Sequence, residues 1–83
     1  MSEIKLDYPA VVDGEKIERL NMRRPKVLDQ KAANKSGTND EGREITLFAN
    51  LCDVDTKVID ELDLLDYQKL QETYTGFLSP GTK

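Results

Sequence analysis

Four acidic residues in the second half of the chain are the clearest candidates for chemistry. Asp60, Asp63 and Asp66 follow one another at helical-turn spacing, and Glu61 adds a fourth carboxylate. Oxygen ligands of this kind suit hard cations. However, Asp63 stands where a helix is expected to begin and Asp66 lies in its first turn, where carboxylates cap backbone N–H groups and complement the helix dipole. We therefore predict capping roles and no metal site, with a cation site as the alternative.

Other residue types that support catalysis are scarce. The sequence has no histidine, which removes the commonest general base and metal ligand. Its one cysteine, Cys52, lies in an apolar helical run and is expected to be a buried hydrophobe rather than a reactive thiol. Arg23 and Arg24 could hold a phosphate group, but a structural role at a strand-to-helix corner is the simpler interpretation. We predict no catalytic, cofactor-binding or metal-binding residues and therefore no enzyme.

Charge is distributed unevenly along the 83 residues. Residues 1–31 contain seven Lys/Arg and six Asp/Glu, whereas residues 40–72 contain three Lys/Arg and ten Asp/Glu. Nucleic-acid binding needs clustered cationic side chains, so the acidic second half argues against a nucleic-acid partner. This half is expected to be a solvated helical surface, or alternatively a face that complements a basic or amphipathic protein.

Length and composition predict a single domain, residues 1–83, with an ordered core over about residues 3–78 and a flexible tail at 79–83. Hydrophobic residues make up 37% of the chain and charged residues 34%, so we expect a globular domain with a thin core. No apolar run is long enough to span a bilayer and no signal-peptide pattern opens the chain, which favours no membrane contact and a cytoplasmic location.

The N-terminal residues alternate apolar and polar types as in a β-hairpin. The alternation runs over residues 4–8, and Asp13-Gly14 is a strong signal for the turn. Pro9 cannot donate to the ladder, so pairing is expected to break there or to run along an edge. In the return strand, residues 15–22, the apolar alternation changes from one face of the strand to the other.

Ile17 belongs to one face of the return strand, whereas Leu20 and Met22 belong to the other. We predict a β-bulge near Glu18-Arg19 that realigns them. A two-stranded hairpin is marginal in water and must pack against the helices that follow.

The first of those helices is predicted to begin with Pro25 at its first position and to end near residue 34 or 35. Its expected buried groups are Val27, Leu28, Ala32 and the stem of Lys31. Gly37 is expected just past its end, within a polar linker.

A second helix is expected to be capped by Thr38, Asn39 or Asp40 and to reach about Cys52, and a very short one to follow an Asp55 cap. With a last helix capped by Asp63, the predicted fold class is α+β, an N-terminal β-hairpin packed against three to four short α-helices.

The last helix carries one apolar stripe, at steps of three or four residues. The stripe consists of Leu64, Tyr67, Leu70, Tyr74, Phe77 and Leu78. Leu70 in its middle and Phe48 on the second helix are expected to be buried. Tyr74, Phe77 and Leu78 at its end are the candidate partner-binding residues, because so small a chain has difficulty covering them; the alternative is that they close the core over the hairpin.

Several of these segments, in this order, resemble a known family. They are the run Arg23-Arg24-Pro25 after the hairpin, the pattern Leu62-Asp63-x-x-Asp66-Tyr67-x-x-Leu70, and the ending Gly76-Phe77-Leu78. Together they are similar to the small tail assembly chaperones of Mu-like and related contractile-tailed phages, over about residues 4–78.

This resemblance implies a non-enzymatic chaperone that binds the long tape measure protein and keeps it soluble until the tail tube polymerises around it. It also implies a location in the host cytoplasm and absence from the mature virion. A homo-oligomer is left open. The main alternative is a small regulatory DNA- or protein-binding module of the repressor or antirepressor type, against which the acidic balance argues. A third is an enzyme subunit or accessory domain, against which the lack of histidine and of a cysteine pair argues.

Overall fold

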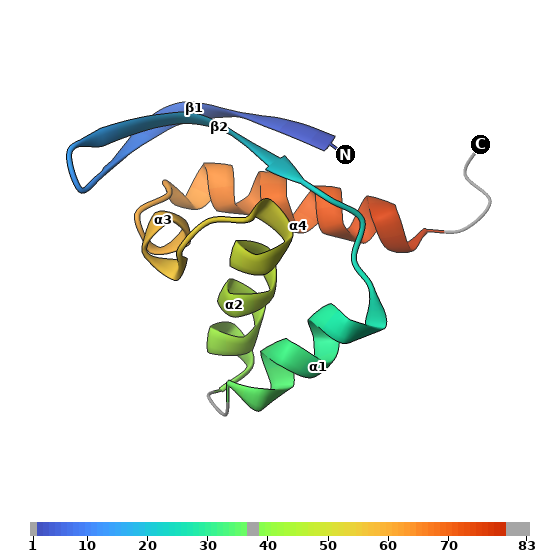
Figure 1. Ribbon diagram of the computed structural model, residues 1–83. Helices are drawn as coiled ribbons and strands as arrows, with labels where there is room; N and C mark the ends of the chain where they lie inside the picture. Colours follow the sequence, from blue (N-terminus) through green and yellow to red (C-terminus); the bar gives the residue numbers. More distant parts are fainter. Residues whose placement is uncertain (1, 37–38, 80–83) are drawn as a thin grey trace.

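The computed structural model describes residues 2–36 and 39–79, which form a β-hairpin followed by four helices. β1 (Ser2–Val12) pairs antiparallel with β2 (Glu15–Met22), and the helices are α1 (Val27–Lys35), α2 (Asp40–Cys52), α3 (Thr56–Asp60) and α4 (Leu64–Leu78). This order confirms the predicted α+β class. The hairpin lies along one side of α4, and α2 and α1 lie on the other side (Figure 1). The predicted Gly37 helix end, and the predicted tail beyond Ser79, lie outside the described residues.

The hairpin turn forms at the predicted dipeptide. Asp13 and Gly14 have φ angles of 52° and 81°, and positive values at both positions are typical of a type I′ turn. From the turn, pairing runs back to Ala10 opposite Ile17, stops, and resumes at Lys5 opposite Arg19. The predicted break in pairing around Pro9 is therefore confirmed.

The bulge lies in β1, whereas the prediction placed it in β2. Residues 6–9 of β1 lie opposite Glu18 alone, so the extra residues belong to β1 and not to the Glu18-Arg19 region of β2. Their effect is the expected one, because Ile17 packs against the same core as Leu20 and Met22. The irregularity falls in β1 because Pro9 has no N–H to donate there.

The core lies where the hairpin meets α2, α3 and α4. Phe48 and Leu70 are both 0% exposed, as predicted, and the Phe48 ring packs against Tyr67 and Tyr74 at centroid distances of 5.7 and 5.6 Å. α1 contributes no side chain to this cluster. The buried members are Ile4, Leu20, Met22, Phe48, Ala49, Leu51, Cys52, Val58, Ile59 and Leu70.

Helix caps explain several of the polar residues between these elements. The side chain of Asn39 accepts a hydrogen bond from the Gly42 amide at 2.8 Å, which selects it from the predicted cap candidates for α2. Asp55 and Asp63 begin α3 and α4 as predicted, and each accepts a hydrogen bond from the amide two residues later at 3.0 Å.

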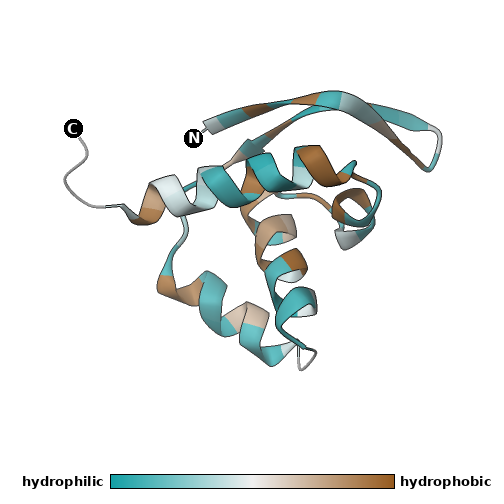
Figure 2. Ribbon diagram, turned by 180° about the vertical axis from the view of Figure 1, so that it is seen from behind, coloured by the Kyte–Doolittle hydropathy of each residue, from teal (hydrophilic) through white to brown (hydrophobic). Residues whose placement is uncertain are grey.

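The first helix differs from its prediction in both its start and its buried face. α1 begins at Val27 with Lys26 as N-cap, two residues later than the predicted start at Pro25. All four groups expected to be buried are exposed, while Asp29 is buried with Ala33; the four are Val27, Leu28, Lys31 and Ala32. Figure 2 shows the start of α1 as strongly hydrophobic, away from the hairpin. The reason is that the Asp29 carboxylate accepts hydrogen bonds from Arg23 and from the Lys26 amide, and these contacts turn its side of the helix inward.

Candidate functional site

The four carboxylates that suggested a cation site do not converge. Asp60, Glu61 and Asp63 are exposed, whereas Asp66, in the first turn of α4, is fully buried. Asp63 is occupied as the cap of α4. Among residues 2–36 and 39–79, no cluster of three or more potential metal ligands is found. The arrangement favours the capping interpretation and adds an unpredicted role for Asp66.

Asp66 attaches α4 to the bulge in β1. Its two carboxylate oxygens accept hydrogen bonds from the backbone amides of Asp7 and Tyr8, at 2.9 and 3.0 Å. These are amides for which the broken ladder provides no β2 partner. Burial would raise the pKa of Asp66, but these hydrogen bonds and the nearby Lys69 outweigh burial and lower the pKa.

Lys69 completes this attachment from one helical turn further along α4. Its ammonium lies 3.4 Å from an Asp66 oxygen and 3.0 Å from Asp7 Oδ2, and it donates to the backbone carbonyl of Lys5 at 2.9 Å. The hydrogen bond and charge of Asp7 raise the pKa of Lys69, with Asp66 adding to the effect. The buried carboxylate is thus paired and hydrogen-bonded, as an ionised group in the interior must be.

A second buried carboxylate attaches α1. Asp29 receives two hydrogen bonds from the Arg23 guanidinium, at 2.8 and 2.7 Å, and one from the Lys26 amide at 2.9 Å. The Arg23 hydrogen bond lowers the pKa of Asp29 to about 2, although burial opposes the shift. The Arg23 amide in turn donates to the Leu51 carbonyl at the end of α2. Arg23 is therefore structural, which favours that interpretation of the arginine pair over phosphate binding.

The only thiol in the sequence lies in an environment that makes it unreactive. Cys52 is buried at the end of α2, within the core cluster. Burial raises the pKa of its thiol to about 11, so the nucleophilic thiolate is rare near neutral pH. The prediction of a buried hydrophobe is confirmed.

The three candidate partner-binding residues lie at the end of α4 but differ in their surroundings. Tyr74 and Phe77 are half-buried and pack against the core, and the Arg24 guanidinium lies 5.9 Å from the centre of the Phe77 ring. Leu78 is 57% exposed. The candidate surface thus has one open aliphatic side chain beside two aromatic rings that also serve the core.

Four other large apolar side chains are exposed on helices, and the sequence interpretation did not assign any of them to the surface. They form two adjacent pairs, Val27 with Leu28 in the first turn of α1 and Leu64 with Leu65 in the first turn of α4. For α1, the sequence did contain one indication that Val27 and Leu28 are exposed. No apolar stripe continues from Val27 and Leu28, because Lys31 and Lys35 occupy the next positions on that side.

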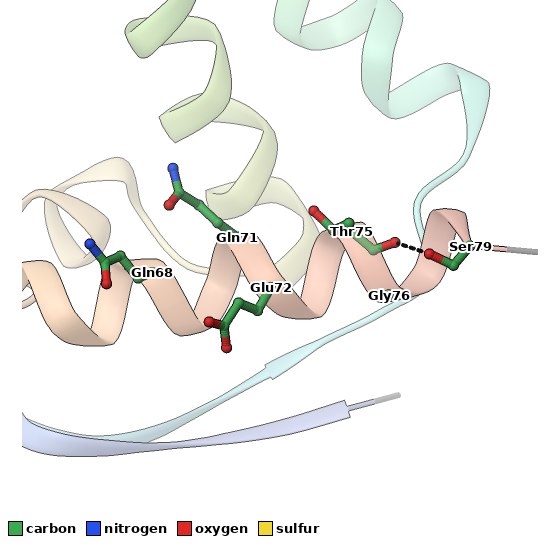
Figure 3. Close-up of a pocket in the computed structure, with 6 residues that line it drawn as sticks. All are labelled: Gln68, Gln71, Glu72, Thr75, Gly76 and Ser79. Atoms are coloured by element: carbon green, nitrogen blue, oxygen red, sulfur yellow. Dashed lines mark hydrogen bonds between the residues drawn. The ribbon is translucent and has the colours of Figure 1, made fainter. Parts of the chain in front are cut away.

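A shallow hollow of about 550 Å³ lies along α4. Figure 3 shows its lining, formed by Gln68, Gln71, Glu72, Thr75, Gly76 and Ser79, which all come from this one helix and its end. The Ser79 hydroxyl donates to the Thr75 carbonyl at 3.1 Å. Glu72 is the single charged residue among these six, so the hollow lacks the paired acid and base that catalysis needs.

None of the helices within residues 2–36 and 39–79 is long and apolar enough to cross a bilayer.

The comparisons with known proteins agree with the resemblance drawn from the sequence. A family model described as "Phage tail assembly chaperone proteins, E, or 41 or 14" matches residues 3–79, nearly the whole chain. No curated protein and no solved structure matched in the other two comparisons. The family match spans the hairpin, all four described helices and both buried carboxylates, and on this ground the chain belongs to the family of phage tail assembly chaperone proteins.

Proposed function

We propose that this chain binds the tape measure protein of its phage and keeps it soluble until the tail tube encloses it. The observation that carries the proposal is the family match over residues 3–79. The proposed role is non-enzymatic and belongs to the host cytoplasm before the virion is complete. A tape measure protein is long and helical, and its apolar stripe would aggregate if it stayed exposed to water.

The end of α4 is the proposed contact surface. Leu78 is open to solvent, and the partly exposed Phe77 ring beside it is held by Arg24. An amphipathic client helix that lays its apolar side on these residues would bury them together, as in other helix-in-groove interactions. Aromatic rings with limited rotamer freedom are well suited to this, since they lose little entropy on binding.

The test is co-expression of the full chain with the tape measure protein, with the soluble fraction of the latter as readout. Leu78→Ser should abolish solubilisation and leave the melting transition of the chaperone unchanged, because Leu78 is exposed. Phe77→Ala should weaken solubilisation too, but it should also lower the melting temperature by a few degrees, since the ring packs against the core.

Val11→Ser is the matched control. Val11 is 63% exposed and lies on the hairpin near the turn, so the change removes a similar apolar side chain from a different surface. If Leu78→Ser and Val11→Ser solubilise the client equally well, the end of α4 is not the binding surface. If the wild-type chain fails to raise the soluble fraction, and binds duplex DNA at micromolar concentration instead, the proposed function is wrong.

A further inference from the structure

Lys and Arg side chains that form no ion pair with a described residue gather on and next to α1. Five described Lys/Arg side chains form no ion pair with a described residue, and four of these lie within residues 24–35. The only acidic residue in that segment, Asp29, is buried against Arg23. The surface of the segment is therefore uniformly positive on a chain with a formal net charge of −4. The four cations are Arg24, Lys26, Lys31 and Lys35.

Two of these cations share a face with the exposed apolar pair of α1. At about 100° per residue, Val27, Leu28, Lys31 and Lys35 lie on one side of the helix, opposite the buried Asp29 and Ala33. Val27 and Leu28 are 74% and 70% exposed. We call these four exposed residues the basic face.

The junction of α3 and α4 has the complementary composition. Leu64 and Leu65 are exposed there, next to the exposed carboxylates of Asp60 and Glu61. Neither carboxylate forms an ion pair with a described residue. We call these four residues the acidic face. Each face thus combines two adjacent apolar side chains with two unpaired charges, and the charges have opposite sign.

The two faces cannot meet within one molecule. In Figure 1, α3 and the start of α4 lie on one side of the molecule, and α1 lies on the other side, below α2. Two copies, in contrast, can bring the basic face of one onto the acidic face of the other.

We propose that this chain self-associates head to tail, with the basic face of one copy docked on the acidic face of the next. The contact removes Val27 and Leu28 of one copy and Leu64 and Leu65 of the other from water. It also pairs charges that form no ion pair with a described residue of their own copy. Because the two faces differ, the contact is heterologous and can add further copies. This inference concerns the chain alone and does not depend on the client proposed above.

The test is sedimentation velocity of the full chain at low salt, with charge reversals on each face. Lys31→Glu/Lys35→Glu and Asp60→Lys/Glu61→Lys should each lower the association constant at least about tenfold. The second variant is the more telling one, because it reduces the net negative charge and would by itself favour association. High salt should weaken the wild-type contact, since these exposed charges are screened over about 10 Å at 0.1 M.

Two further experiments serve as controls, one with the variants mixed and one with all four changes in a single chain. The two variants mixed together should co-assemble in alternation, because the two intact faces dock on each other and the two reversed faces are also opposite in charge. A chain that carries all four changes should regain self-association, because its reversed faces are again complementary and its formal net charge is again −4. A wild-type chain that stays monomeric at low salt, or variants that fail to complement each other, would overturn the proposal.

Discussion

Asp66 and Asp29 are the two acidic side chains buried among the described residues, and they attach two different parts of the molecule. Asp66 binds backbone amides of β1 next to the apolar core, whereas Asp29 binds Arg23 and a helix-start amide at the edge of the molecule. Both carboxylates are ionised and fully partnered. What differs is the apolar packing around them.

The hairpin is held by both the core and Asp66, because Ile4, Leu20 and Met22 belong to the central cluster. α1 contributes no member to that cluster and buries only Ala33 beside its carboxylate. This comparison indicates that α1 depends on polar contacts for its position. Its opening should therefore be a local event, whereas loss of the hairpin should unfold the domain.

The largest effect should come from the same substitution made in each region. Leu70→Ala removes a side chain that is 0% exposed and should cost about 2–5 kcal/mol of unfolding free energy, while Leu28→Ala on α1 should cost less than about 0.5 kcal/mol. Urea unfolding followed by circular dichroism measures both. Equal losses would mean that α1 is packed as firmly as the core.

Asp66→Ala should cost about 3 kcal/mol, because it leaves the Asp7 and Tyr8 amides and the Lys69 ammonium without their acceptor. Asp66→Asn should cost less, since its carboxamide oxygen can still accept one amide. Urea unfolding gives the loss, and hydrogen exchange at the two amides locates it. Unchanged exchange at both amides in Asp66→Ala would show that the bulge holds its shape without the carboxylate.

Asp29→Ala should cost about 2 kcal/mol, and the loss should be confined to α1, since the partner Arg23 is itself partly exposed and can be solvated. Hydrogen exchange should become fast within α1 and stay slow in β2 and α4. If protection falls throughout the molecule instead, α1 and the core form one cooperative unit.

The smallest effect is a dependence on pH. The pKa of Asp29 is lowered to about 2 in the folded chain, so its stabilisation is complete above its unfolded pKa of about 3.9 and is lost as pH falls toward 2. Wild type should therefore lose about 1–2 kcal/mol more than Asp29→Asn between about pH 4 and pH 2. Thermal melts across this range measure the difference, and parallel curves would rule out Asp29 as the titrating group.

The sequence was informative wherever a structure is determined by neighbours along the chain. The Asp13-Gly14 turn and the Asp55 and Asp63 caps depend on contacts within a few residues, and they form as predicted. Phe48 and Leu70 were predicted from helical periodicity and are buried. The end of α4, predicted to bind a partner, remains a proposal.

The errors concern contacts that join distant segments. The bulge was assigned to β2 from the change of face between Ile17 and Leu20. It lies in β1, where its amides bind Asp66, 58 and 59 residues further along the chain. The buried face of α1 was wrong because Arg23 and the Lys26 amide turn Asp29 inward, so that Val27 and Leu28 face solvent. Apolar content alone carries no information about such polar contacts.

The bulge in β1 has a consequence for solubility. A two-stranded sheet presents edges to which another extended chain can add by hydrogen bonding, and this is a common route to aggregation. Along residues 6–9 the backbone offers little to such a chain, because Asp66 occupies the amides of Asp7 and Tyr8 and Pro9 has none. Asp66 thus attaches the hairpin to α4 and also makes part of an edge strand unavailable for intermolecular β-sheet growth.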